Sequence, residues 1–313
     1  MSFKMLNLES LLLTCAGSIR AAVDQKKTRL VRHVMTHRQD GDWSGFDEML
    51  KFDNDLLLVF TSEQRDNKYK DAELILVFVA TEGTRCLLRG AFWSKGQISY
   101  ERFCSLYPKR IEFEDFRQSR GIHCAKEQGS YYELVPCVEL SDLYNRLVID
   151  WGTATVSWVQ TRTDKEIWAV LPKGFVSEFP GWDKIFISHQ ELQAIIENPD
   201  GNKDWHHFLA AHDGVYVILD VATGKKYVGS ACGAKDGKGG IWGRWSGYAK
   251  TGDNGNIGLV EVLESGLTSA NNFKYSLHHV FPKGTKTKEE ILTYESLLKE
   301  KLGTRKHGGL NRN

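Results

Sequence analysis

The sequence predicts an α+β protein with a β-rich domain over residues 1–199 and a smaller domain over residues 200–313. The length of 313 residues suits two domains, each with a core of its own. Short β-prone segments separated by turn residues fill the longer first part of the chain. Residues 198–202 (Asn-Pro-Asp-Gly-Asn) combine turn residues with a helix breaker, so the boundary is predicted near residue 200.

The first domain is expected to be a curved sheet or small barrel with peripheral helices. Helices are predicted at about 8–24 and 42–52. Residues 72–80 have strand propensity, and Glu82-Gly83 leads into a second β-prone run, which predicts a hairpin. Further short β-prone segments follow at 131–140, 146–152, 155–160 and 166–171.

The second domain should hold a β-hairpin-containing sheet flanked by helices. Two short helices are predicted at 189–197 and 203–212, on either side of the boundary. Residues 214–219 and 226–230 are expected to form the hairpin, and a helix should cover 241–248. A last helix should begin at the capping box of residues 287–290 and end at Gly303. On it, one face carries Ile291, Glu295, Leu298 and Leu302.

Composition indicates a globular protein, with 41% hydrophobic and 26% charged residues. No apolar run is long enough for a membrane span, and the N-terminal segment is expected to be an amphipathic helix of a cytoplasmic protein. The six cysteines form no C-x-x-C pair, which argues against a zinc knuckle or a disulfide framework.

The formal charge of +1 is unevenly distributed along the chain. Residues 201–313 hold 16 Lys and Arg against 11 Asp and Glu, a net +5, which leaves −4 on the remainder. A mildly basic second domain suits a phosphate-rich partner, although many surfaces carry such an excess.

Two tyrosine triads lie in the predicted hairpin, followed by polar residues in a fixed order. The ordered set is Gly214-Val215-Tyr216, Tyr227-Val228-Gly229, Arg244, Tyr248, Glu295 and Asn311. Over residues 212–313 this set resembles the GIY-YIG nuclease family, in particular its restriction-endonuclease members. Valine stands in each triad where the family name has isoleucine, an apolar exchange that strand packing should tolerate.

The resemblance implies a metal-dependent endonuclease that leaves a 5′-phosphate and a 3′-hydroxyl. It implies that Tyr216 is the base, assisted by Tyr227 and Tyr248, and that Glu295 binds Mg²⁺ or Mn²⁺. It also implies roles in catalysis for Arg244 and Asn311.

The chemistry of the same residues agrees with that activity. A planar guanidinium such as that of Arg244 fits phosphate oxygens bidentately. A single carboxylate can hold Mg²⁺, which keeps several waters. A tyrosine acts as a base only if its pKa falls from about 10, and we expect Arg244 and Lys226 to lower it. The lysines expected to contact the DNA backbone are Lys226, Lys235, Lys238 and Lys250.

Taken one by one, these residues have ordinary interpretations. A lone tyrosine is more often a strand residue, Arg244 a solvated helix residue, and Glu295 the partner of a lysine. Asn311 lies near the end of the sequence and is open to fraying. Only the joint order of the set favours a nuclease.

The first domain is expected to select the target. Its tryptophans are mostly packing residues, with a minority hypothesis of an aromatic pocket for a flipped or modified base. The β-rich pattern around residues 85–92 resembles the barrel of PUA-like readers of modified bases. The leading hypothesis is restriction of foreign or modified double-stranded DNA, where a cut in both strands requires two copies, as in a homodimer, or two separate events. Alternatives are a repair or mobile-element endonuclease, a nuclease or toxin acting on RNA, and a nucleic-acid-binding protein without catalysis.

Overall fold

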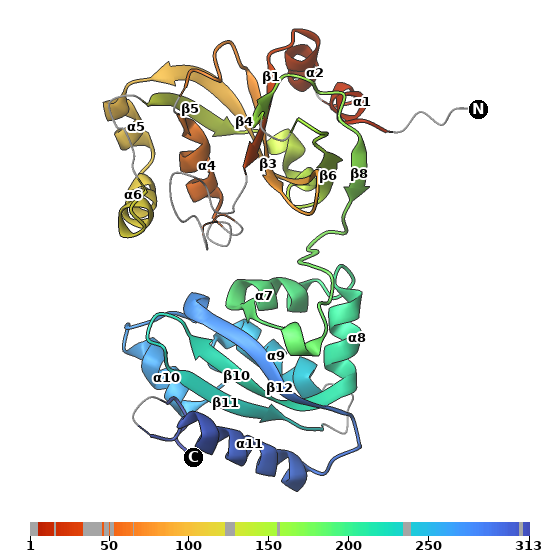
Figure 1. Ribbon diagram of the computed structural model, residues 1–313, viewed down its shortest axis with the longest axis vertical. Helices are drawn as coiled ribbons and strands as arrows, with labels where there is room; N and C mark the ends of the chain where they lie inside the picture. The colour runs from red at the N-terminus through yellow and green to blue at the C-terminus, as the bar shows by residue number, and fades with distance from the viewer. Residues whose placement is uncertain are drawn as a thin grey trace, which may run out of the picture. The chain divides into compact units, whose positions relative to one another are not determined.

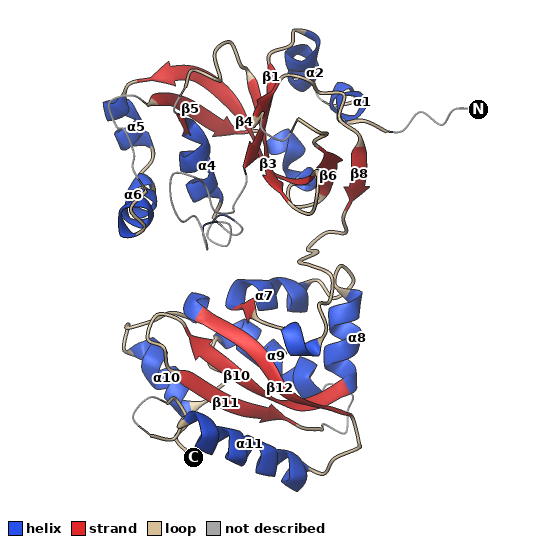
Figure 2. Cartoon of the chain, in the orientation of Figure 1, coloured by secondary structure: helices blue, strands red, loops and turns tan. Residues whose placement is uncertain are grey.

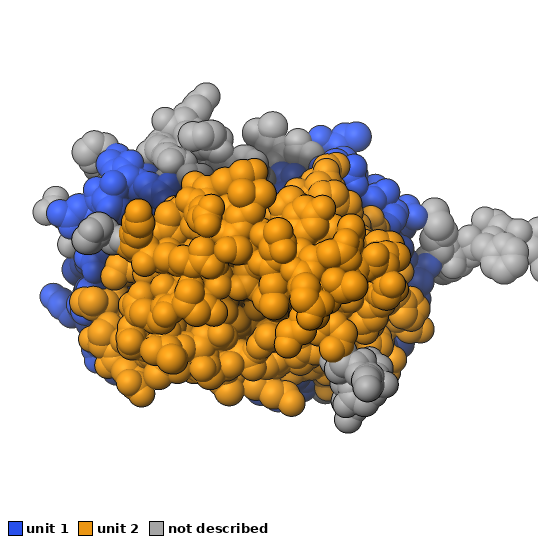
Figure 3. Space-filling model, turned by 90° about the horizontal axis from the view of Figure 1, so that it is seen from below, with its two compact units in different colours: residues 1–171 blue, residues 172–313 orange. Residues whose placement is uncertain are grey.

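The structure is a computed structural model, and it describes residues 6–15, 17–33, 46, 50, 53–64, 66–122, 129–154, 157–233, 239–306 and 309–313. The chain divides into two compact units, unit 1 over residues 1–171 and unit 2 over residues 172–313, which Figure 3 shows in two colours. Both units mix helices with sheet, so the protein is α+β (Figure 2).

Unit 1 is built around a large sheet. Its strands are β1 (Thr28–His33), β2 (Glu63–Gln64), β3 (Leu74–Ala80), β4 (Arg85–Ile98), β5 (Ser130–Pro136), β6 (Leu147–Asp150), β7 (Val159–Gln160) and β8 (Ile167–Val170). Its helices are α1 (Leu8–Leu13), α2 (Gly17–Asp24), α4 (Asn54–Ser62), α5 (Tyr100–Leu106), α6 (Arg110–Ser119) and the 3₁₀ helix η1 (Val138–Leu143).

The sheet of unit 1 has the strand order β2-β5-β4-β3-β1-β7, and β6 pairs with both β4 and β8. The long strand β4 pairs with β6 near its start and with β5 near its end, so the sheet curls into a half-barrel (Figure 1). Only β1 and β3 run parallel among the described pairs.

Both faces of β3 are covered, which explains its continuous apolar sequence. Leu74 and Leu76 face a core with side chains of α1 and α2, whereas Ile75 and Val77 face a core with side chains of α4, α5 and α6. The predicted hairpin of β3 and β4 is present, with Ile75 opposite Phe92. The predicted helix at 8–24 is two helices, α1 and α2. The one predicted at 42–52 lies outside the described residues except for positions 46 and 50.

Unit 2 has a smaller sheet covered by helices. Its strands are β9 (Ile187–Ser188), β10 (His212–Asp220), β11 (Lys226–Ala231) and β12 (Phe273–Pro282). Its helices are η2 (Trp182–Lys184), α7 (His189–Glu197), α8 (Lys203–Ala211), α9 (Gly240–Thr251), α10 (Ile257–Glu264), η3 (Ala270–Asn272) and α11 (Lys288–Leu302). The strand order is β11-β10-β12-β9, with antiparallel pairing throughout, so β11 is an edge strand.

Helices pack on both faces of this sheet (Figure 1). On one face, Val215 and Val217 of β10 pack with Ile291 and Leu298 of α11. On the other face, Ile218 belongs to the core that contains side chains of α7, α8, α9 and α10. The alternation of β10 therefore sends successive residues toward α11 and toward α9.

The division between the units differs from the predicted boundary near residue 200. Residues 172–199 belong to unit 2, because β9 pairs with β12 and Leu192 and Ile195 of α7 are buried in the unit 2 core. The turn at residues 198–202 connects α7 to α8 within unit 2. No helix in the described part of the chain is long and apolar enough to cross a membrane.

Candidate active site

The hairpin of β10 and β11 brings the two triads together on one face of the sheet. Tyr216 lies opposite Gly229, and Tyr227 lies opposite Ile218. Cross-strand partners share a face, so both phenols point toward the α9 side. Gly229 is required there, because a Cβ at this position would lie 2.5 Å from the Tyr216 hydroxyl and 2.8 Å from the Tyr227 ring.

The first triad needs its glycine for a similar reason. A Cβ at Gly214 would lie 2.4 Å from the carbonyl oxygen of His279 on β12. The β10–β12 register shifts between Val215 and Tyr216, immediately after this close approach. Gly214 therefore allows β10 to approach β12 closely, and Gly229 leaves room for the two phenols. Both glycines belong to the triads identified in the sequence.

Helix α9 supplies a third phenol and a guanidinium. Arg244 and Tyr248 are four residues apart, which places them on the same side of the helix. Tyr248 is fully buried, and its hydroxyl lies 2.9 Å from that of the buried Tyr216. The Tyr248 ring also meets the rings of Tyr216 and Tyr227 edge-on, at centroid distances of 5.8 and 6.4 Å.

Asn256, which immediately precedes α10, connects the remaining phenol to this pair. The Tyr227 hydroxyl donates to Asn256 Oδ1 at 2.7 Å, and Asn256 Nδ2 donates to the Tyr248 hydroxyl at 2.9 Å. The hydroxyls of Tyr216, Tyr248 and Tyr227 therefore form one hydrogen-bonded network with Asn256, called here the phenol network.

Burial keeps the phenols protonated. Burial raises the pKa of Tyr216 well above 10, and the phenol of Tyr227 raises it further, whereas Arg244 and the Tyr248 hydrogen bond act in the lowering direction. Burial also raises the pKa of Tyr227 and that of Tyr248. Arg244 lowers the pKa of Tyr216 as expected and Lys226 is not among the causes, but the net shift is upward because desolvation outweighs the nearby positive charge.

Arg244 is the cation beside the phenol network. Its side chain is solvent-exposed and makes no hydrogen bond or ion pair with any residue that the structure describes. Although the residue is exposed, partial desolvation by the neighbouring rings acts to lower its pKa, and the phenols of Tyr216, Tyr248 and Tyr227 give a net rise, so the guanidinium is charged. Arg244 therefore has donors available for an anion at the edge of the phenol network.

Glu295 approaches from α11, on the opposite face of the hairpin. The predicted capping box of Thr287 and Glu290 begins this helix, and Gly303 ends it in the left-handed conformation. Glu295 is 8% exposed and acts electrostatically on both Tyr216 and Tyr227. The carboxylate of Glu295 and the guanidinium of Arg244 thus act on the same two phenols.

The Glu295 carboxylate already has two partners. Lys299 Nζ lies 2.6 Å from Oε1, one helical turn away, and the Ser230 hydroxyl of β11 donates to Oε2. Lys299 is only 3% exposed and also donates to Asn313 Oδ1 at 2.6 Å. The ordinary interpretation of Glu295 as the partner of a lysine is therefore part of the structure.

Glu295 is the residue through which this site could hold a divalent metal ion. The described residues contain no group of three His, Cys, Asp or Glu side chains that could hold a metal ion. Mg²⁺ does not need one, because it keeps several waters and commonly takes one or two carboxylates together with substrate phosphates. Glu295 would supply that carboxylate after exchanging Lys299 for the metal.

Asn311 is held firmly in the structure. It is 2% exposed, its Oδ1 accepts from the Val228 N–H at 2.9 Å, and its Nδ2 donates to the Val228 carbonyl at 2.8 Å. The Leu310 N–H also donates to the Lys226 carbonyl. The amide side chain therefore satisfies the free edge of β11 as a neighbouring strand would.

Two of the predicted DNA-binding lysines, Lys226 and Lys250, are described, and they lie on different elements. Lys226 starts β11, is half-buried, and donates to the Gly224 carbonyl at 3.3 Å. Lys250 is exposed in the last turn of α9. Lys235 and Lys238 lie outside the described residues.

Three residues of this region were missed from the sequence. Asn256, Ser230 and Lys299 each contact a predicted site residue. Lys299 had a signal in its spacing of four residues from Glu295 on a predicted helix. Ser230 had a weaker sequence signal, since it directly follows the second triad. Asn256 had no sequence signal, because only the tertiary structure brings it to the phenols.

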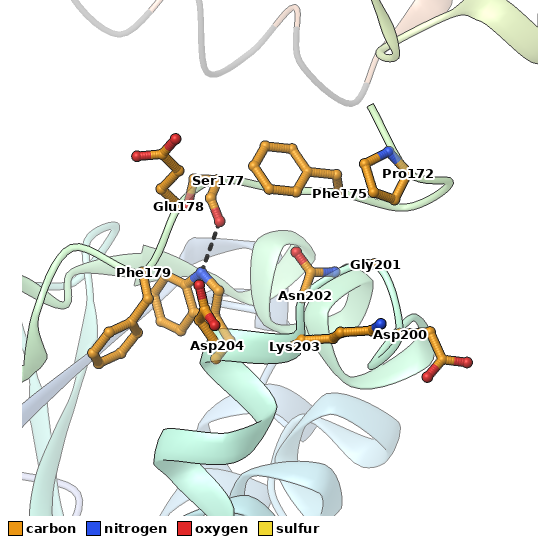
Figure 4. Close-up of a pocket in the computed structure, with 11 residues that line it drawn as sticks. Pro172, Phe175, Ser177, Glu178, Phe179, Asp200, Gly201, Asn202, Lys203 and Asp204 are labelled. Carbon is orange, nitrogen blue, oxygen red and sulfur yellow. Dashed lines mark hydrogen bonds between the residues drawn. The ribbon is translucent and has the colours of Figure 1, made fainter. Parts of the chain in front are cut away.

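A hollow of about 320 Å³ in unit 2 lies apart from these residues (Figure 4). Phe175 and Phe179 line it, together with the start of α8, where the buried Trp205 donates its indole N–H to the Ser177 carbonyl. None of the phenols, Arg244 or Glu295 contributes to its lining.

Comparisons of this chain with protein-family models, with curated proteins and with solved structures give no match. The interpretation of the site therefore depends on its own geometry.

Proposed function

We propose that unit 2 hydrolyses phosphodiester bonds of DNA with the help of Mg²⁺ or Mn²⁺. The observation that carries the proposal is the arrangement of an unpaired guanidinium, a hydrogen-bonded group of phenols and a buried carboxylate around β11. Arg244 and Glu295 act electrostatically on the same phenols of Tyr216 and Tyr227, although they come from helices on opposite faces of the sheet.

Each group has a task in phosphodiester hydrolysis. The Arg244 guanidinium binds non-bridging phosphate oxygens and stabilises the charge that develops on them. Tyr216 accepts the proton of the attacking water, which requires the phenol first to release its own proton to hydroxide from solvent. Tyr227 and Tyr248 orient this group through the phenol network. A metal ion held by Glu295 would supply Lewis-acid stabilisation of the phosphate and the leaving oxygen.

The ordered motif residues of the GIY-YIG family support the same assignment, since six of them surround one edge strand. On this proposal unit 1 chooses the target, and restriction of foreign or modified double-stranded DNA is the biological role. Repair or mobile-element cleavage would use the same chemistry. A double-strand break would need two copies of the chain or two successive events, because one centre acts on one strand.

The experiment that tests the proposal is a cleavage assay on a panel of substrates. The full chain is incubated with plain plasmid DNA, modified phage DNA and structured RNA, each with Mg²⁺, with Mn²⁺ or with a chelator, and the ends are mapped. We expect metal-dependent cuts in DNA with 5′-phosphate ends. Cleavage of RNA alone, or equal cleavage in the chelator, would contradict the proposal.

A second candidate function is DNA binding without catalysis. The observation that favours it is the closed state of Glu295, whose two oxygens are engaged by Lys299 and Ser230. Glu295→Ala separates the two functions. A nuclease keeps DNA binding and loses metal-dependent cleavage in this variant, whereas a binding protein shows no cleavage of any substrate before or after the change.

A further inference from the structure

The side chain of Asn256 lies between two phenols, although a residue directly before a helix ordinarily caps that helix. Asn256 is the residue before α10, where an asparagine side chain ordinarily accepts from the first backbone N–H groups of the helix. Here it makes no such bond. Its amide instead contacts Tyr227 and Tyr248, and Nδ2 also donates to the Asp253 carbonyl at 2.8 Å.

The Asp253 contact fixes which way the amide faces. A carbonyl oxygen only accepts, so the amide atom next to it is the nitrogen. Nδ2 must then donate to the Tyr248 oxygen, and Oδ1 must accept from the Tyr227 hydroxyl.

This orientation sets the order of the protons in the phenol network. The Tyr227 hydroxyl donates its hydrogen to Asn256 Oδ1, and the Tyr248 oxygen accepts a hydrogen from Asn256 Nδ2. The hydrogen of Tyr248 can then point to the Tyr216 oxygen at 2.9 Å. In that arrangement Tyr216 stands at the end of the series and receives a hydrogen bond, and a donated hydrogen bond stabilises a phenolate.

We infer that Asn256 is a positioning residue that orders these hydrogen bonds so that Tyr216 is the phenol that gives up its proton and serves as the base. The inference rests on the proposed function for its catalytic meaning. The order of the hydrogen bonds is independent of the proposed function, because it is a property of the folded protein.

The charged and titratable groups around Tyr216 come from three elements. They are Tyr227 from β11, Arg244 and Tyr248 from α9, and Glu295 from α11. Among them only Tyr248 shares a hydrogen bond with Tyr216 in the described part of the chain, so a change at Asn256 acts on Tyr216 through Tyr248.

Asn256→Asp tests the inference with a side chain of nearly the same shape. An aspartate accepts from both Tyr227 and Tyr248 and donates to neither, so Tyr216 loses its donor. A role limited to the start of α10 would leave this variant unharmed, because aspartate before a helix is as favourable as asparagine. Asn272→Asp is the matched control, since the Asn272 amide donates to Thr268 Oγ1, away from the phenols.

Two measurements read the result. In an ultraviolet difference titration, the first phenol to ionise should do so at higher pH in Asn256→Asp than in wild type. Cleavage at fixed neutral pH should fall by about 10- to 100-fold, as for the loss of one hydrogen bond to a charged group, and the rise of the rate with pH should move in the same direction. Asn272→Asp should match wild type in both.

A second variant, Tyr248→Phe, removes the intermediate hydroxyl and leaves the ring in place. We expect it to reproduce the shift, and we expect the double variant to add nothing to it. An Asn256→Asp protein with the wild-type phenol titration overturns the inference. A shifted titration in a protein that cleaves no DNA would support the ordering of the phenols and contradict the proposed function instead.

Discussion

Arg244 and Glu295 reach the same two phenols from opposite faces of the hairpin, and they do so in opposite states. Arg244 is exposed and has no hydrogen-bonding or ionic partner among the described residues. Glu295 is buried, paired with Lys299 and hydrogen-bonded by Ser230. The comparison teaches that the guanidinium is ready for an external anion, whereas the carboxylate has to exchange an internal cation before it can take a metal ion.

The phenol between these two groups should give the largest effect. Tyr216→Phe removes the proposed base and leaves the ring, so cleavage should fall by about 10²- to 10⁴-fold. In wild type the rate should rise with pH from neutral toward alkaline values, because the raised pKa keeps Tyr216 protonated at neutral pH. A rate that is flat with pH, or a fully active Tyr216→Phe, would remove Tyr216 from the chemistry.

The same raised pKa values make a prediction about stability. The buried phenols favour the protonated form, so their contribution is complete below the unfolded pKa of about 10. It is lost as the pH rises through the folded values. Unfolding in denaturant at increasing pH should therefore show a steeper alkaline loss for wild type than for Tyr216→Phe.

Breaking the ion pair between Glu295 and Lys299 should destabilise unit 2. Glu295→Ala leaves Lys299 buried without its carboxylate, a change that typically costs about 3–5 kcal/mol. Chemical denaturation measures it. The double variant with Lys299→Met should recover most of the loss, and a Glu295→Ala protein as stable as wild type would mean that the pair contributes nothing.

The next prediction concerns Asn311, which hydrogen-bonds to the free edge of β11. Asn311→Ala leaves the Val228 N–H and carbonyl without partners, which should cost about 1–3 kcal/mol in the free energy of unfolding. The structure gives Asn311 a supporting role, so cleavage per folded molecule should change little. A large loss of cleavage with unchanged stability would instead make Asn311 part of the chemistry, as the family resemblance implies.

The exchange of Lys299 for a metal ion predicts the smallest effect. Lys299→Met removes the competing cation, so Mg²⁺ or Mn²⁺ should bind about tenfold more tightly and raise the melting temperature of the variant more than that of wild type. Lys301→Met, exposed on the same helix, is the control. Equal metal-induced stabilisation of the two variants would show that Lys299 does not compete for Glu295.

Local features of the fold were predictable from the sequence. The hairpin of β10 and β11 and the bounds of α11 follow from alternation, turn residues and a capping box, which act within a few residues. The division between the units was not, because the contribution of residues 172–199 to unit 2 depends on pairing with β12, far along the chain.

The candidate site also combines features that local sequence predicts with features that depend on the tertiary structure. The positions of Tyr216, Tyr227 and Arg244 follow from strand and helix periodicity. The state of each group does not, since the pKa of Tyr216 is governed by burial, and the partner of Glu295 by the burial of Lys299. The spacing of four residues indicates Lys299 as a partner of Glu295, but it does not indicate that this lysine is buried.

The most direct measurement of the central claim is single-turnover cleavage by Arg244→Ala beside its binding to the same DNA. If Arg244 stabilises the phosphate during reaction, cleavage should fall by about 10²- to 10³-fold while the fold is intact and DNA binding weakens far less. Lys301→Ala, which removes an exposed cation of α11 that has no assigned role, should cleave nearly as wild type does. Equal cleavage by Arg244→Ala and wild type would contradict the account.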